Sequence, residues 1–275
     1  MNEWVGILHA VKHQGIIRNL MHLIQQEALH GNNLALNLQS AICRAQAMKG
    51  TDLKNIILQV FQSIEPLRLH EWSSFLQYLV SVKEEKWLVP EAHIRVSPLW
   101  QQRLYTSSKQ AYLEFQKHSK DQDIILQQIS LSHLLSGVPE PVIRSDAVFA
   151  TQIICTVLAR YESESDTHEL IKESMLEQIL HTFQTLLKTE KSKTEVERQL
   201  PSVIHALLAI STHSELSSCR LAALSCLDSL ASLPYHVIHP YRKQVAKATV
   251  DACDDRKRRV RLLASTCRQK WTTTA

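Results

Sequence analysis

The stretch Asp254-Asp255-Arg256-Lys257-Arg258-Arg259-Val260-Arg261 decides the fold of this chain. It lies at the junction of two segments with helical periodicity, residues 239–253 and residues 255–271. In the second segment, apolar residues recur at spacings of three and four, as on the buried side of a helix. They are Val260, Leu263, Cys267 and Trp271. Two amphipathic segments joined by a short acidic turn predict a pair of helices that pack against each other.

The composition also favours a helical protein. Of 275 residues, 44% are hydrophobic and 21% are charged, which is ordinary for a folded chain. Glycine is scarce, because there are 5 glycines and none follows Gly137. Strand-and-turn folds and phosphate-binding loops both need glycine where φ is positive. Its scarcity therefore predicts helices joined by short turns.

Helical periodicity recurs over most of the chain. We expect further helices at residues 99–118, 121–136, 145–161, 168–188, 199–213 and 216–232. Apolar stripes also predict helices before residue 97, around Trp4, Ile17, Leu34, Ile56 and Trp72. The segment 86–98 contains two prolines and is the clearest irregular connection. It divides a region of N-terminal helical repeats, residues 1–96, from residues 97–275.

Three local features refine the helix boundaries. Asp166 and Glu169 have the spacing of a capping box, in which two side chains satisfy the free N–H groups at a helix start. The charged residues from Lys188 to Lys193 predict a solvated linker. Pro201 is expected in the first turn of its helix, where the missing N–H is harmless.

An internal repeat predicts how the helices are arranged. Residues 126–143 align without gaps on residues 221–238, with six of 18 positions identical. The offset of 95 residues equals two units of about 47, close to the range of HEAT and armadillo repeats. An acidic turn followed by Val-Arg and an apolar stripe is typical of the second helix of a HEAT repeat. We therefore predict an all-α, HEAT/armadillo-like solenoid of about six or seven helical hairpins, in which neighbouring repeats bury each other's apolar faces.

Charge and cysteine content limit the possible partners. The net charge is +4, and residues 254–271 alone contribute +5 through seven Lys or Arg and two Asp. Because the basic charge is local, we expect no direct nucleic-acid binding. No apolar run approaches the ~18 residues of a membrane span, and the N-terminus does not resemble a signal peptide. The six cysteines are scattered without a CxxC motif, which indicates reduced thiols in the cytoplasm or nucleus.

Residues 97–271 resemble the C-terminal HEAT region of the MMS nineteen family, the targeting scaffold of cytosolic iron–sulfur protein assembly. The segments that carry the resemblance are Trp100–Thr106, Leu131–Leu135 with Val138–Ile143, Arg220–Cys226, Leu233–Arg242 and Asp254–Arg261. The chain ends at Ala275 without the aromatic-apolar tail of the family. Residues 1–96 carry no resemblance beyond their helical periodicity.

The resemblance implies a non-catalytic scaffold of the cytoplasm and nucleus. Such a scaffold would dock a MIP-eighteen-type assembly adaptor and a WD-repeat assembly subunit. It would present apoprotein clients for cluster insertion, including DNA helicases, polymerases and primase. This would link the chain to DNA repair, replication and transcription. The alternative is a HEAT/armadillo adaptor in transport or transcription with no iron–sulfur role.

The candidate partner-binding residues lie near the C-terminus. The basic cluster consists of Arg256, Lys257, Arg258, Arg259 and Arg261. Its cations could bind an acidic partner, nucleic acid or an import receptor. Alternatively, Asp254 and Asp255 cap the helix while the arginines solvate it and pair with the neighbouring repeat.

A second group of candidates consists of Tyr235, Tyr241 and Arg242. Together with His236, these residues lie in and after an interhelix turn. They could form an aromatic hot spot for a partner, or they could join one repeat to the next. The sequence does not decide between the two.

No catalytic, cofactor-binding or metal-binding residues are predicted. His9 and His13 have the i, i+4 spacing of a zinc-binding helix, but the required glutamate is replaced by Ala10. Cys219 and Cys226 share a helix face, and no further cysteine lies close enough in sequence to complete a cluster site. An enzyme would need a pocket with convergent titratable groups, and the sequence contains no such pattern.

Overall fold

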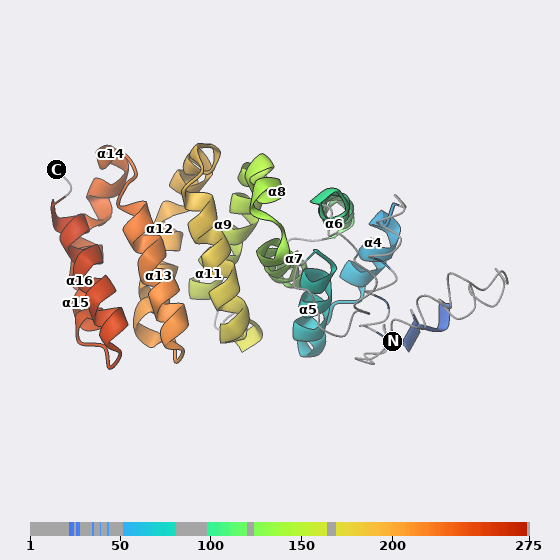
Figure 1. Ribbon diagram of the computed structural model, residues 1–275, viewed down its shortest axis with the longest axis horizontal. Coiled ribbons are helices and arrows are strands. Elements are labelled where there is room, and N and C mark those ends of the chain that lie inside the picture. Colours follow the sequence, from blue (N-terminus) through green and yellow to red (C-terminus); the bar gives the residue numbers. More distant parts are fainter. Residues whose placement is uncertain are drawn as a thin grey trace, which may run out of the picture. The chain divides into compact units, whose positions relative to one another are not determined.

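The computed structural model describes residues 52–80, 98–119, 124–163 and 169–273, together with a few positions between 22 and 43. These parts contain twelve α-helices and two short 3-10 helices, and no strand occurs in them (Figure 1). The all-α prediction is confirmed. No helix within the described ranges is both long and apolar enough to span a membrane. The chain divides into two compact units, residues 1–142 and residues 143–275.

The first unit is built from pairs of helices that are distant in sequence. Its elements are α4 (Lys54–Gln62), η1 (Pro66–Arg68), α5 (Leu69–Val80), α6 (Pro98–His118) and α7 (Ile125–Gly137). Helix α4 packs against α6, and α5 packs against α7. The α5–α7 contact is close, because a Cβ atom at Gly137 would lie 2.8 Å from the carbonyl oxygen of Gln77. A glycine is therefore required where these two helices meet.

The second unit contains three helical hairpins stacked in sequence order. After α8 (Glu140–Ser145), its main helices are α9 (Ala147–Ser163), α11 (Glu173–Leu187), α12 (Glu190–His213), α13 (Ser217–Leu230), α15 (Arg242–Cys253) and α16 (Arg258–Thr273). Helices α9, α12 and α15 form one layer, and α11, α13 and α16 form the other (Figure 1). The short elements α14 (Tyr235–Ile238) and η3 (His239–Tyr241) connect α13 to α15. This arrangement is compatible with an α-solenoid.

The internal repeat corresponds to a repeated turn. In both copies a helix ends, an apolar residue and a proline follow, and the next helix begins. The same backbone bonds close both turns. In the first copy, the N–H of Val138 donates to Leu135 O (3.1 Å) and the N–H of Val142 to Pro139 O (2.9 Å). In the second copy, the N–H of Leu233 donates to Leu230 O (3.0 Å) and the N–H of Val237 to Pro234 O (2.9 Å). The sequence repeat therefore reports a real structural equivalence.

The predicted start of α12 is wrong. Residues 188–193 were expected to form a linker, but α12 begins at Glu190, so only Lys188 and Thr189 connect it to α11. Buried Ser192, Glu195 and Val196 continue the inward face of the helix. The outward face of these first turns is charged, and Lys193 pairs with Glu190 there at 2.7 Å. These charged residues made the segment look like a linker in the sequence.

Pro201 consequently lies inside α12 and not in its first turn. A proline at an interior position removes one N–H from the backbone ladder, which is costly in an isolated helix. Here Leu200, Val203 and Ile204 are almost completely buried beside it. Their burial keeps the helix continuous.

Other boundaries differ less. The helix predicted over 168–188 is replaced by α11, which begins at Glu173. Asp166, and with it the expected capping box, lies outside the described residues. The same is true of the helices expected around Trp4 and Ile17 and of the connection 86–97. The helices around Ile56 and Trp72 are confirmed as α4 and α5.

Candidate protein-docking surface

The turn between α15 and α16 is held by a buried ion pair. Asp255 accepts hydrogen bonds from the Arg220 guanidinium, at 2.7 Å from Nε and 3.3 Å from the second nitrogen. Both side chains are only 11% exposed. The same guanidinium donates to the carbonyl oxygens of Ser214 and Glu215, at 2.7 and 2.9 Å. Arg220 thus joins the α12–α13 turn to the α15–α16 turn.

Asp255 also organises the start of α16. Its carboxylate accepts the N–H of Lys257 at 2.6 Å, which satisfies one of the free donors before the helix. Burial raises the pKa of Asp255, but its hydrogen bonds from Arg220 and from the Lys257 N–H outweigh this effect and hold the pKa below its usual value. The carboxylate is therefore ionised at neutral pH.

The predicted basic cluster separates into two groups. The Arg261 guanidinium donates to the carbonyl oxygens of Asp255 and Arg256, at 2.7 and 3.2 Å, so it braces the turn. By contrast, Arg256, Lys257, Arg258 and Arg259 are exposed. Among the described residues, their side chains have no hydrogen-bond or ion-pair partner. We call these four residues the basic tip.

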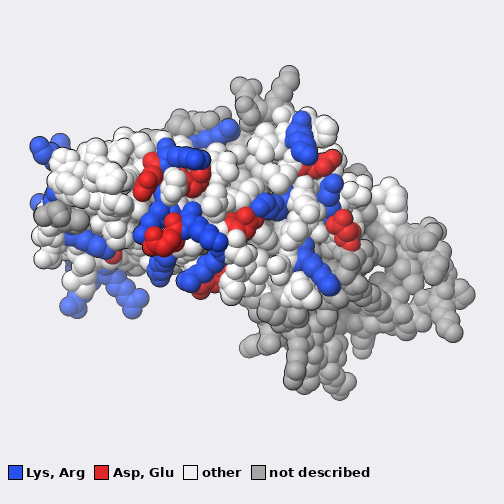
Figure 2. All heavy atoms as spheres, turned by 90° about the horizontal axis from the view of Figure 1, so that it is seen from above, with Lys and Arg blue, Asp and Glu red and all other residues white. Residues whose placement is uncertain are grey.

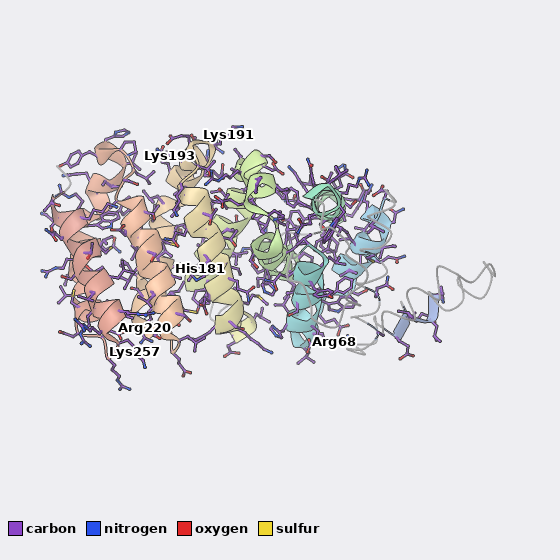
Figure 3. All side chains as sticks on the ribbon, viewed as in Figure 1. Arg68, His181, Lys191, Lys193, Arg220 and Lys257 are labelled. Carbon is purple, nitrogen blue, oxygen red and sulfur yellow. The ribbon has the colours of Figure 1, made fainter. Side chains whose placement is uncertain are left out.

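Figure 3 shows where the basic tip lies in the second unit. Lys257 and Arg220 lie at the same end of the helices, whereas Lys191 and Lys193 lie at the opposite end. Four like charges in consecutive positions repel one another. No acidic side chain from the described part of the chain compensates them. The structure therefore leaves this group open to an acidic partner, and partner binding there stays a prediction.

The second group of candidates is used mainly inside the hairpin. Arg242 donates from Nε to the carbonyl oxygen of Trp271 at 2.9 Å, and from a terminal nitrogen to that of Thr272 at 2.6 Å. Its guanidinium lies 5.6 Å from the centre of the Tyr235 ring, which in turn lies 5.0 Å from the His239 ring. Arg242 thus caps the end of α16. Tyr241 is half-buried beside this group.

Sequence reasoning missed two contacts that fix α16 against α13. The indole N–H of Trp271 donates to the carbonyl oxygen of Leu227 at 2.9 Å. The ammonium group of Lys270 donates to the carbonyl oxygen of Asp228 at 2.7 Å and approaches its carboxylate at 3.2 Å. The apolar stripe identified Trp271 as buried, but its hydrogen-bond partner lies in another repeat.

Two cysteines of the second unit, Cys219 and Cys226, are buried free thiols. Cys219 and Cys226 donate from sulfur to the carbonyl oxygens of Glu173 and Leu180, at 3.1 and 3.4 Å. Burial raises the pKa of Cys219 to about 11 and that of Cys226 still further. Since the thiolate is the metal ligand, both are held in the weaker form. No group of three potential metal ligands occurs in the described residues, and His9 and His13 lie outside them.

This burial predicts a pattern of thiol reactivity. With N-ethylmaleimide at mildly alkaline pH, half-buried Cys253 should react about 100-fold faster than Cys226, because only an accessible thiolate attacks the reagent. The rate at Cys219 should rise about tenfold per pH unit until its pKa is reached. Mass spectrometry of timed samples gives each rate. Equal rates in the native protein would contradict the burial, and equal rates after denaturation provide the control.

A cavity of the first unit is lined mainly by polar side chains. It is lined by His22, Gln26, Asn55, Ile56, Gln59, Gln62 and Ser63. The histidine is the one titratable side chain in this lining. Nucleophilic catalysis by Ser63 would need an adjacent general base, but the Ser63 hydroxyl donates to the carbonyl oxygen of Gln59 at 2.9 Å. This lining supplies amides for hydrogen bonding instead.

Comparisons with known proteins bear on the family. No protein-family model matches the chain. Curated relatives occur in Arabidopsis thaliana (27% identical over 180 residues), Dictyostelium discoideum (31% over 180) and Bos taurus (26% over 255). The matches cover 65%, 63% and 85% of this chain but 15%, 15% and 23% of the relatives. The chain thus corresponds to about 15% of the length of the first two relatives.

All three relatives have the same name, MMS19 nucleotide excision repair protein homolog. A human protein with this name is also similar, at 25% identity over 185 residues. The matched part includes well over half of this chain in each case. The resemblance found in the sequence is therefore confirmed: over most of its length the chain is similar to curated proteins named MMS19 nucleotide excision repair protein homolog.

Proposed function

We propose that this chain is a non-catalytic scaffold of cytosolic iron–sulfur protein assembly, built from HEAT-type hairpins. It would dock a MIP-eighteen-type adaptor, a WD-repeat assembly subunit and apoprotein clients, in the cytoplasm and the nucleus. Those clients would act in DNA repair, replication and transcription. Because the chain corresponds to about 15% of its first relatives, it would supply one part of such a scaffold.

The observation that carries the proposal is the sequence similarity to the MMS19 relatives, which extends over 63–85% of the chain in three distant organisms. Their name connects them with nucleotide excision repair. The iron–sulfur role comes from the family resemblance of residues 97–271. The stacked hairpins of the second unit support the scaffold part of the proposal, since an elongated stack offers wide surfaces for several partners.

The mechanism would be proximity. A scaffold that binds two partners at once raises the effective concentration of one relative to the other, provided that its own geometry is stiff. Arg220, Arg242 and Trp271 each link separate elements of the second unit through hydrogen bonds. The buried thiols would keep the scaffold itself from taking up the cluster.

Affinity purification of the full chain tests the proposal. Recovery of the MIP-eighteen-type adaptor together with the WD-repeat subunit would support it. Recovery of transport or transcription factors without either assembly protein would contradict it and favour the alternative adaptor function.

The basic tip gives a sharper prediction for the same assay. The triple substitution Arg256→Glu, Lys257→Glu and Arg259→Glu should weaken binding of the assembly partner by about tenfold or more, because it replaces three attractive charges with repulsive ones. Helicity should not change, because these side chains have no internal partner among the described residues. Surface plasmon resonance and circular dichroism measure the two effects.

A matched control lies at the other end of the helices. Lys188→Glu, Lys191→Glu and Lys193→Glu change the net charge equally. Lys191 and Lys193 lie at the end opposite to the basic tip (Figure 3), and Lys188 is the C-cap residue of α11, just before α12 begins at Glu190. Acidic and basic side chains are interspersed on the face seen in Figure 2, so no single-sign field is lost there. Equal weakening by both triple variants would show that net charge matters and not the basic tip. Unchanged binding by the first variant would place the docking site elsewhere.

A further inference from the structure

Helices α15 and α16 expose a continuous surface at the C-terminal end of the second unit. In Figure 1 they are the outermost pair of the stack, with α12 and α13 packed on one side. Six exposed residues on these helices carry the argument. They are Lys243, Lys247 and Val250 from α15, and Arg258, Leu262 and Arg268 from α16. We call them the terminal surface.

Helix periodicity shows that these residues face away from the core. On α16, the buried residues are Val260, Ala264, Cys267 and Trp271. Leu262 and Arg258 are about half a turn from this stripe, at about 100° per residue. On α15, Lys243 and Val250 are seven residues apart and hence on one side of the helix.

The two apolar residues lie at nearly the same height on their helices. Val250 precedes the end of α15 at Cys253 by three residues, and Leu262 follows the start of α16 at Arg258 by four. In an antiparallel hairpin, with about 1.5 Å of rise per residue, these positions are at nearly the same height. Val250 is 38% exposed and Leu262 is 59% exposed. They are the two apolar residues of the terminal surface, and we call them its apolar patch.

Cations surround this patch without being neutralised. By the same register, Lys243 and Arg268 lie on one side of the patch and Arg258 lies on the other. In the described residues, the side chains of Lys243, Lys247, Arg258 and Arg268 have no hydrogen-bond or ion-pair partner. The binding partner of this surface should therefore bring carboxylates at both ends and an apolar centre.

The charge distribution over the chain strengthens this conclusion. Residues 242–275 contain ten Lys or Arg and three Asp, a net charge of +7. The remaining residues contain twenty-one Lys or Arg and twenty-four Asp or Glu, a net charge of −3. One of the three aspartates, Asp255, is already paired with Arg220. The terminal surface is thus a basic end on an otherwise slightly acidic chain.

We propose that the terminal surface binds an acidic amphipathic α-helix of another protein. The apolar stripe of that helix would pack on Leu262 and Val250, and its flanking carboxylates would pair with Lys243, Arg258 and Arg268. A second copy of this chain is a poor occupant, since two surfaces that each carry the cations Lys243, Lys247, Arg258 and Arg268 would repel each other. Nucleic acid would leave the apolar patch uncovered, and the acidic remainder of the chain would repel a longer polyanion.

This inference rests on the proposed docking role and names the kind of partner. Apolar anchors flanked by charges are a common way of binding a helix to a surface, with anchors at i, i+3 or i+4, and i+7. Leu262 and Val250 would each contact one such anchor of the bound helix. Arg242 and Arg261 are excluded from the surface, because both guanidinium groups are used inside the hairpin.

A synthetic peptide tests the proposal without any assembly protein. The probe is a fluorescent peptide of about 20 residues, or about 30 Å as a helix, with leucines on one face and glutamates on the others. Its comparison is a peptide of the same composition with the leucines scattered around the helix. Fluorescence anisotropy with the full chain should show about tenfold tighter binding of the amphipathic peptide. Binding should weaken steeply from about 50 to about 200 mM salt.

Two substitutions separate the apolar and the charged contributions. Leu262→Ser should weaken binding by about tenfold, and so should Arg258→Glu combined with Arg268→Glu. Val148→Ser is the matched apolar control, because Val148 is 49% exposed on α9 at the start of the same unit. Lys188→Glu combined with Lys191→Glu is the matched charge control. Neither control should change binding by more than about twofold.

Three outcomes would overturn the proposal. Equal binding of both peptides would show that the terminal surface binds the peptide through its charge alone and does not need an apolar stripe on the peptide. Full binding by Leu262→Ser would place the contact elsewhere. Tighter binding of a short DNA duplex than of the peptide, lost in Arg258→Glu with Arg268→Glu, would identify a nucleic-acid contact. Since no assembly factor takes part, peptide binding without recovery of the adaptor would reject the proposed function and leave this inference standing.

Discussion

Replacing Trp271 with alanine should lower the free energy of unfolding by about 3–5 kcal/mol. The side chain is fully buried between α16 and α13. Its removal leaves a cavity and deprives the carbonyl oxygen of Leu227 of its donor. Both losses occur at the contact that holds the last hairpin on the stack. Urea denaturation followed by circular dichroism measures the change.

The variant Trp271→Phe separates the two losses. Phenylalanine retains most of the apolar contact but has no N–H, so the cost should fall to about 1–3 kcal/mol. Hydrogen exchange should locate the loss of protection in α16 and α13, while α5 of the first unit keeps its protection. A change smaller than about 1 kcal/mol for Trp271→Ala would contradict the packing of α16 on α13.

Replacing Asp255 with alanine should cost about 2 kcal/mol at neutral pH, because it removes hydrogen bonds to a charged partner and leaves Arg220 without its carboxylate. The residue also satisfies the N–H of Lys257, so the start of α16 should fray. Asp254→Ala is the matched control, since Asp254 is exposed. It should change stability by less than about 0.5 kcal/mol.

The pH dependence of this effect has a defined sign. The pKa of Asp255 is lowered in the folded protein. Its stabilising contribution is therefore complete above the unfolded value, about 3.9, and is lost as the pH falls through the lower, folded value. The difference between wild type and Asp255→Ala should be constant from pH 7 to about 5 and shrink below about 4. A difference that grows on acidification would contradict an ionised Asp255.

A double-mutant cycle on stability measures whether Arg220 is the partner of Asp255. If Arg220 and Asp255 interact as the distances indicate, the combined loss of both should be smaller than the sum of the single losses by about 1 kcal/mol or more. Strict additivity would show that the two side chains act separately. Lys54 and Glu114, an ion pair more than 30% exposed in the first unit, should show a coupling below about 1 kcal/mol.

Local patterns predicted most of the secondary structure. The helical stripes placed α5, α6, α13 and α16 to within a few residues, because 3.6-residue periodicity depends only on neighbours in sequence. The start of α12 was missed, since its first turns carry Lys and Glu on the outward face. Pro201 then suggested a helix start. Packing of Val196 and Leu200 overrode that local signal.

The candidate site was less predictable. Helix capping by Asp254 and Asp255 was one of two alternatives for the acidic turn, and Asp255 does accept the N–H of Lys257 before α16. Its partner Arg220 lies 35 residues earlier, and only the stacking of two hairpins brings them together. Of the adjacent leucines, the apolar stripe in the sequence placed Leu263 and not Leu262 on the buried side of the helix. The structure leaves Leu262 in solvent and half-buries Leu263.

The proline within α12 affects how the stack can deform. Having no N–H, Pro201 leaves the carbonyl oxygen four residues earlier, at Glu197, without its usual helical donor. Bending the helix at this point therefore breaks no further backbone bond. Because α12 packs between α9 and α15, a small change of its curvature would tilt the last hairpin relative to the first. The middle hairpin of the second unit can therefore bend at Pro201, and this bending would change the distance between its first and last hairpins.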